Sequence, residues 1–151
     1  QAAPAVPSQV VHYLAWGVAI TIFPLIFLGG LVTTQDAGMA VPDWPGTYGY
    51  NMFAYPASAW LYGPFDLMVE HGHRLLGSLA GMLAIVTCAA AFYLESRPWV
   101  KWFSAGLLLG IIIQGVLGGV RVLGDLRLVA MIHGCTGPLV FAYAAALVAV
   151  T

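Results

Sequence analysis

Four apolar segments, each long enough to cross a lipid bilayer as a helix, dominate this sequence of 151 residues. A membrane-spanning helix needs about 20 residues, and the segments cover residues 10–33, 66–94, 99–123 and 126–151. Only 7% of the residues are charged, whereas a soluble domain carries roughly 25%. We therefore predict an all-α integral membrane protein, in which residues 1–151 form a single four-helix transmembrane bundle surrounded by membrane lipid.

The connections between these segments predict how the helices are arranged. The links at residues 94–98 and 123–126 are short, which makes the helices that they join antiparallel neighbours. The connection at residues 34–65 is long and rich in Gly, Pro, Trp and Tyr. Long loops in compact proteins are usually functional or disordered, and aromatic residues suit the membrane interface. We predict that this loop is an ordered cap on an antiparallel bundle.

The basic residues give a weak signal for orientation. The long loop contains no Lys or Arg, and Arg97 and Lys101 lie toward the opposite side of the membrane. Arg121 and Arg127, however, flank the link on the loop's own side, so the count of positive charges is nearly tied. We predict that the loop is extracytoplasmic. A net charge of −1 without a basic cluster does not suggest a nucleic-acid partner.

Two histidines are predicted to lie at the same depth in the membrane. His73 and His133 each lie seven residues into an apolar segment that begins on the loop side, which corresponds to ~10 Å of helix. Two helices that run in the same direction would thus present imidazoles at one level, which suits the two axial ligands of a haem iron in a bundle. Gly77 and Gly134 follow the histidines and would leave room for a porphyrin.

The polar cluster around the first histidine, 70-EHGHR-74, offers further candidates. Glu70 is three positions before His73, on the same helix face. It either forms an ion pair with Arg74 or Arg121, or places a carboxylate beside the haem, where it could orient the ligand, carry a proton or stabilise positive charge. His71 points away from His73, which favours an interfacial residue or a neighbour of the ligand.

Three arginines and one amide complete the set of polar candidates. Arg74, Arg121 and Arg127 lie at the loop end of the bundle. They are candidates to bind haem propionates, and the alternative is an interfacial anchor that extends to water. Gln114 is predicted to form a hydrogen bond between helices.

Four stretches resemble the heme A synthase family in the same order along the chain. They are 37-AGMAVPDWPGTYG-49, 70-EHGHRLLG-77, 114-QGVLGGVRVL-123 and 132-IHG-134. That family is built from two similar four-helix halves, and this sequence resembles the N-terminal half. We see no internal repeat and no second E-x-x-H motif.

The resemblance implies an activity and roles for particular residues. The family oxidises a methyl group of haem O to the formyl group of haem A, which cytochrome oxidase requires. The histidine pair matching His73 and His133 is usually assigned to the substrate haem, and haem b to the other half. Glu70 matches a functionally important glutamate, for which stabilisation of a carbocation has been suggested. Some members carry a cysteine pair in the first outer loop, which residues 34–64 lack.

The resemblance also implies partners and a location. A second four-helix half or a homo-oligomer would complete the enzyme, and a haem O synthase is a candidate partner. The bacterial cytoplasmic membrane is favoured over the mitochondrial inner membrane. Two other classes of function stay open at this point. A b-type cytochrome that only transfers electrons would need the histidines but not Glu70, and a scaffold without cofactor would use them only for hydrogen bonds between helices.

Overall fold

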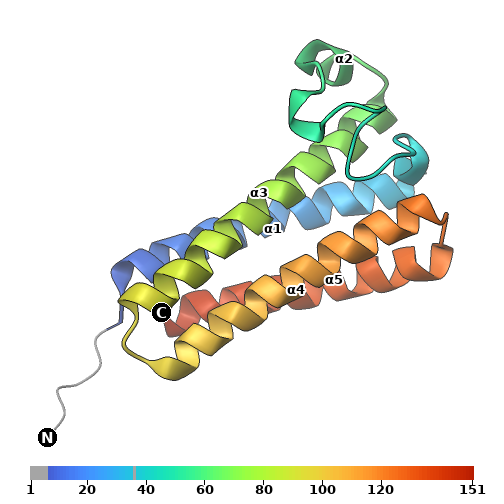
Figure 1. The fold of residues 1–151 in the computed structure, drawn as a ribbon. Helices are drawn as coiled ribbons and strands as arrows, with labels where there is room; N and C mark the ends of the chain where they lie inside the picture. Colours follow the sequence, from blue (N-terminus) through green and yellow to red (C-terminus); the bar gives the residue numbers. More distant parts are fainter. Residues whose placement is uncertain (1–6, 36) are drawn as a thin grey trace, which may run out of the picture.

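The computed structural model describes residues 7–35 and 37–151, and four long helices form a bundle within them (Figure 1). They are α1 (Gln9–Thr34), α3 (Phe65–Leu94), α4 (Pro98–Leu123) and α5 (Arg127–Val150). No strand occurs in the described part of the chain. The predicted all-α bundle of four membrane-length helices is therefore confirmed, and each helix begins and ends within one residue of its apolar segment.

The helices pack as a four-membered ring. α1 packs against α3 and α5, and α4 packs against the same two helices. Neighbouring helices are antiparallel, so α3 and α5 lie on a diagonal and run in the same direction (Figure 1). Small side chains let the backbones approach closely, and the buried core contains Ala15, Ala80, Ala84 and Ala144.

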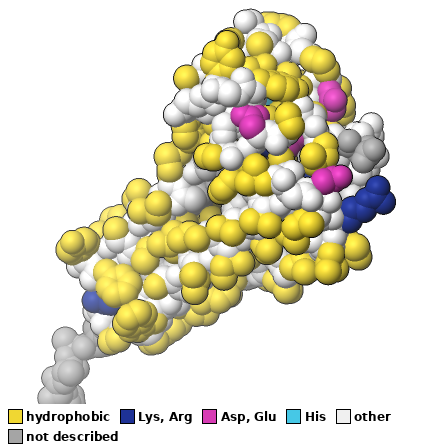
Figure 2. Space-filling model, turned by 45° about the vertical axis from the view of Figure 1, so that its right-hand side comes forward, with side chains coloured by type: hydrophobic (Ala, Val, Ile, Leu, Met, Phe, Trp, Pro, Cys, Tyr) yellow, Lys and Arg dark blue, Asp and Glu magenta, His cyan; other side chains and the backbone are white. Residues whose placement is uncertain are grey.

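The outer faces of the helices are apolar and suit contact with lipid. Ile20, Phe27, Ile112 and Leu139 are all exposed. Figure 2 shows apolar side chains along the length of the bundle, with charged side chains gathered near its ends. All four helices are long and apolar enough to cross a membrane. Which side of the membrane the loop occupies stays a prediction.

The loop between α1 and α3 folds over one end of the bundle (Figure 1). It contains two short 3-10 helices, η1 (Ala37–Met39) and η2 (Met52–Ala54), and the short helix α2 (Ala57–Leu61). The indole of Trp44 lies on Gly119 of α4, where a Cβ atom would collide with the ring. This contact gives Gly119 a specific reason to lack a side chain.

Asp43 stabilises a tight turn within the loop. Its carboxylate accepts hydrogen bonds from the amides of Tyr48, at 2.8 Å, and Gly49, at 2.9 Å. Both of these residues have positive φ angles, 50° and 78°. Partial burial raises the pKa of Asp43, but these hydrogen bonds outweigh that effect, so its pKa lies below the ordinary value. The turn therefore keeps its charged cap at neutral pH.

A second polar cluster closes the opposite end of the bundle, where α3 meets α4. Glu95 is buried and forms an ion pair with Arg97, with Nη2 and Oε2 2.9 Å apart. Arg97 also donates to the Val150 carbonyl of α5, at 2.8 Å. The Ser8 amide, just before α1, donates to Glu95 at 3.3 Å. The cluster thus joins the ends of all four helices.

We expect this cluster to make stability depend on pH. The hydrogen bonds and charge of Arg97 lower the pKa of Glu95 from 4.5 to about 2, which corresponds to about 3 kcal/mol of stability. This contribution is complete above pH 4.5 and is lost as the pH falls toward 2, because the unfolded carboxyl binds its proton first. The thermal unfolding temperature in detergent should fall over this range, and the fall should be smaller in Glu95→Gln. An equal fall in both proteins would contradict the assignment.

Candidate functional site

The imidazoles of His73 and His133 meet in the interior of the bundle, near its loop end. His73 lies on α3 and His133 on α5, the two parallel helices of the diagonal. Their ring centroids are 6.3 Å apart and their planes are at 84°. The predicted pairing of these side chains at one depth is therefore what the structure contains, whereas iron ligation stays a prediction.

This geometry fits two axial ligands of one haem. A metal–imidazole nitrogen bond is about 2 Å long, and the ring centroid lies about 1 Å behind that nitrogen, so two opposed axial imidazoles have centroids about 6 Å apart. The Nδ1 atoms of His73 and His133 are buried without a hydrogen-bond partner among the described residues. A buried polar atom without a partner is costly and calls for an explanation. Each imidazole thus has a nitrogen available to coordinate a metal whose other ligands would come from a macrocycle.

Glycines on the neighbouring helices lie against the two histidines. A Cβ atom on Gly29 of α1 would lie 3.2 Å from the His73 ring, and one on Gly118 of α4 would lie 3.4 Å from the His133 ring. Gly77 instead faces α1, and Gly134 has open space beside it. Gly29 and Gly118 thus give clearance to the imidazoles from the neighbouring helices, and the sequence did not predict these two positions. Room for a porphyrin at Gly77 and Gly134 stays a prediction.

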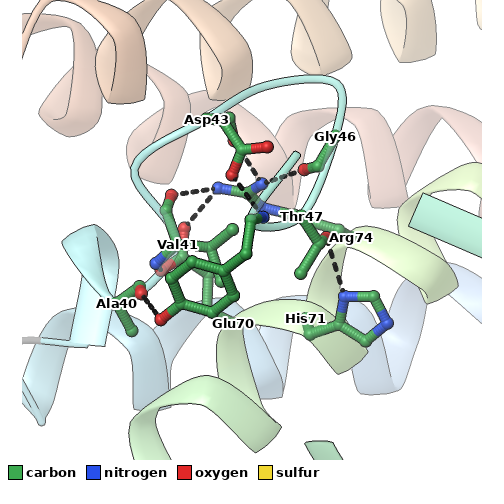
Figure 3. A network of polar contacts seen from close by, with 9 residues as sticks. Ala40, Val41, Asp43, Gly46, Thr47, Glu70, His71 and Arg74 are labelled. Carbon is green, nitrogen blue, oxygen red and sulfur yellow. Dashed lines mark hydrogen bonds and ion pairs between the residues drawn. The ribbon is translucent and has the colours of Figure 1, made fainter. Parts of the chain in front are cut away.

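Glu70 and Arg74 form a buried ion pair that holds the loop (Figure 3). Glu70 is 2% exposed. Its Oε1 accepts from Arg74 at 2.7 Å, and its Oε2 accepts from the amide of Val41 at 2.9 Å. Of the two alternatives for Glu70, the ion pair with Arg74 is present, and both carboxylate oxygens are engaged.

Arg74 of α3 binds the backbone of the loop through its guanidinium (Figure 3). Besides Glu70, its guanidinium donates to the carbonyls of Val41 at 2.6 Å, Asp43 at 2.6 Å and Gly46 at 2.8 Å. Charge-assisted bonds of this kind are stronger than neutral ones. Both terminal nitrogens of Arg74 thus donate to groups of the protein. Neither has a free N–H to donate to the haem propionate that Arg74 was predicted to bind.

His71 is buried beneath the loop. Its Nδ1 lies 3.0 Å from the hydroxyl of Thr47, and its ring lies 5.3 Å from that of Tyr55 and 5.1 Å from that of Trp60. The side chain is fully buried, which does not fit the interfacial alternative of the two predicted. The cluster 70–74 therefore divides: Glu70, His71 and Arg74 fix the loop, and His73 turns into the bundle.

The other two arginines differ sharply in their surroundings. Arg121 is half-buried beside Gly38 of the loop, and it interacts electrostatically with Glu70, His73 and His133. Its guanidinium has no hydrogen bond within residues 7–35 and 37–151. Arg127 is exposed at the start of α5. The structure thus brings Arg121, and not Arg127, to the histidine pair.

The backbone groups that contact Arg74 and Glu70 could not be found from the sequence. These groups are the amide of Val41 and the carbonyls of Val41, Asp43 and Gly46. The side chains of these residues make none of these contacts. Carbonyl groups occur at every residue, so no residue type marks them. The only signal available was the excess of polar side chains at residues 70–74.

The fold and the site together define a class of protein: a four-helix membrane bundle with a capping loop at one end and two neighbouring histidines on parallel helices. Comparison with known proteins then gives the family. The family of cytochrome oxidase assembly proteins called COX15-CtaA matches residues 12–150. This chain therefore belongs to that family, as the resemblance of its motifs predicted.

A curated relative supports the same assignment. Heme A synthase from Geobacillus thermodenitrificans is 26% identical over 114 residues, which are 75% of this chain and 33% of the relative. The matched segment thus spans about a third of the length of that protein. No solved structure gave a significant match.

Proposed function

We propose that this chain is the haem-binding half of a heme A synthase-like membrane oxidoreductase, in which His73 and His133 are the axial ligands of the haem iron. The substrate is haem O, and a methyl group of its ring is oxidised to the formyl group of haem A. The observation that carries the proposal is the pair of opposed imidazoles, 6.3 Å apart, with buried and unpartnered Nδ1 atoms. Membership of the family supports it.

Arg121 is the best candidate to bind a haem propionate. Its guanidinium is free of hydrogen bonds among the described residues, and it acts electrostatically on both histidines. A propionate paired with this cation would gain charge-assisted hydrogen bonds near the polar end of the bundle. Arg74 would act on the haem indirectly, because its terminal nitrogens hold the loop.

A second four-helix unit would complete the enzyme. The matched segment is only 33% of the relative from Geobacillus, which supports a further half that holds haem b. A second four-helix half or a second copy of this bundle would supply that site, and a haem O synthase is a reasonable supplier of the substrate. The membrane proposed is the bacterial cytoplasmic membrane, and the mitochondrial inner membrane is the alternative.

A spectrum and a pigment analysis test the proposal. The protein would be purified in detergent, supplemented with haem, and examined by visible spectroscopy, and the pigment bound during expression would be extracted and identified. We expect the Soret band of a six-coordinate, low-spin haem and haem O or haem A in the extract. Protohaem alone would favour an electron-transferring b-type cytochrome. The absence of any Soret band after supplementation would overturn haem binding altogether.

Glu70→Gln should separate chemistry from haem binding. Glutamine keeps one oxygen acceptor, for either Arg74 or the Val41 amide, and Arg74 still donates to the carbonyls of the loop. The variant should lose stability, so its haem binding is measured beside its activity. The negative charge is lost, and a positioned carboxylate contributes about 10²-fold or more to a rate. With the second half supplied, conversion of haem O should fall by about that factor, measured by chromatography of extracted haems. Undiminished conversion with normal haem binding would remove Glu70 from the mechanism.

A further inference from the structure

An apolar groove runs between α4 and α5, starting beside the histidine site. Its volume is about 350 Å³, and it extends from Leu117 and Ile132 to Gly106 and Tyr143. The distance from Leu117 to Gly106 along α4 is eleven residues, or ~16 Å. The groove is thus long and narrow, and it leads away from the loop end of the bundle. This shape suits a linear apolar chain.

The groove contains one polar pair at the depth of the hydrocarbon core. Gln114 Nε2 donates to the Thr136 hydroxyl at 2.5 Å, and that hydroxyl donates to the Ile132 carbonyl at 2.6 Å. No hydrogen bond reaches the amide oxygen of Gln114 within the described part of the chain. A hydrogen-bond acceptor that has no donor in the lipid interior raises the free energy of the folded state by roughly several kcal/mol. The groove therefore calls for a ligand that is apolar along its length and carries a hydroxyl.

The polar pair of the groove lies one helical turn from the proposed iron site on each helix. Thr136 follows His133 by one turn, and Gly118, which lies against the His133 ring, follows Gln114 by one turn. A ligand held at His133 that carries a hydroxyl and an apolar chain on one edge could therefore place the hydroxyl near the Gln114 amide and the chain in the groove. Haem O carries such a group, because its isoprenoid tail has a hydroxyl close to the ring, whereas protohaem lacks the tail.

We propose that the groove between α4 and α5 binds the hydroxyl-bearing isoprenoid tail of haem O, with the Gln114 amide recognising the hydroxyl. This inference rests on the proposed function and adds the basis on which the site selects haem O over protohaem. The groove faces lipid, so a lipid acyl chain is the competing occupant.

Parallel titrations with haem O and protohaem test the inference. Gly110 lines the groove, and a Cβ atom there would make an ordinary contact with Val140 at 3.7 Å, so Gly110→Leu should fill the groove without moving the backbone. Gly115→Leu is the matched control, because Gly115 is on the same helix, is exposed, and has open space beside it. Binding would be followed by the Soret band in detergent, without turnover.

We expect the unmodified protein to bind haem O more tightly than protohaem, and Gly110→Leu to lower haem O affinity by about tenfold or more, or about 1.4 kcal/mol. Protohaem affinity should be unchanged, and Gly115→Leu should affect neither haem. Gln114→Leu, of similar volume, should also lower the affinity for haem O selectively, and this variant serves if Gly110→Leu fails to fold.

Equal affinities of the unmodified protein for the two haems, or equal losses of affinity for both haems in the variants, would overturn tail binding while leaving the iron site intact. Failure to bind either haem would overturn the proposed function itself.

Discussion

His133→Ala is expected to abolish the six-coordinate, low-spin spectrum of bound haem. His133 and His73 face each other at 6.3 Å between ring centroids, and no third imidazole contacts this pair in the described residues. Removing one axial ligand should leave five-coordinate, high-spin haem. The affinity for haem should fall by at least about a hundredfold, because losing even a hydrogen-bond partner of a metal ligand lowers metal affinity by about 10- to 100-fold. Visible spectroscopy and haem titration in detergent would measure both effects, and His73→Ala should behave alike.

The control for this experiment is His12→Ala. His12 lies at the other end of α1, where its ring contacts Trp16 and Thr151, so the haem spectrum should be unchanged. Added free imidazole should partly restore the low-spin spectrum of His133→Ala, since it can occupy the space of the missing ring. An unaltered low-spin spectrum in His133→Ala without imidazole would show that a different side chain is the ligand.

Arg74→Met is expected to release the capping loop and to destabilise the protein by about 3–5 kcal/mol, the range for breaking a buried ion pair from one side. The substitution removes every bond from the guanidinium to the Val41, Asp43 and Gly46 carbonyls. It also leaves Glu70 buried without its cation. Thermal unfolding in detergent would measure the loss of stability, and limited proteolysis within residues 37–49 would report release of the loop.

Arg127→Met is the matched control, because Arg127 is exposed and its side chain makes no hydrogen bond in residues 7–35 and 37–151. Its unfolding temperature and proteolysis pattern should match those of the unmodified protein. Arg74→Lys should be intermediate, since an ammonium group keeps the charge but cannot reach several acceptors in one plane. A protease-resistant loop in Arg74→Met would contradict the view that Arg74 organises it.

The parts of the structure that the sequence predicted are those with a strong one-dimensional signal. Long apolar runs predicted the four helices, because a helix in lipid must present apolar side chains over its whole length. The short links predicted antiparallel neighbours and hence a parallel pair, α3 and α5. Equal depth for His73 and His133 followed from that pair by counting residues.

The parts that the sequence did not predict depend on contacts between elements far apart in the chain. The cap is organised by loop carbonyls around Arg74, and carbonyls leave no mark in a sequence. Gly29 and Gly118 flank the imidazoles because of how the helices are rotated about their axes, which an all-apolar surface does not encode. His71 was predicted to be an interfacial residue or a neighbour of the ligand because it points away from His73, and the sequence did not show that the loop's aromatic rings would enclose it.

The diagonal placement of the two histidines has a consequence for assembly. α3 and α5 are not among the helix pairs that pack along their lengths, so α1 and α4 hold them in place and few direct contacts join them. In the proposed complex, the haem iron would be bound by one histidine from each of these helices and would thereby link them. Haem binding would then stabilise the folded four-helix bundle. Tight haem binding would then require both helices: a chain in which α5 is absent or has not yet inserted presents a single imidazole and should bind the cofactor only weakly.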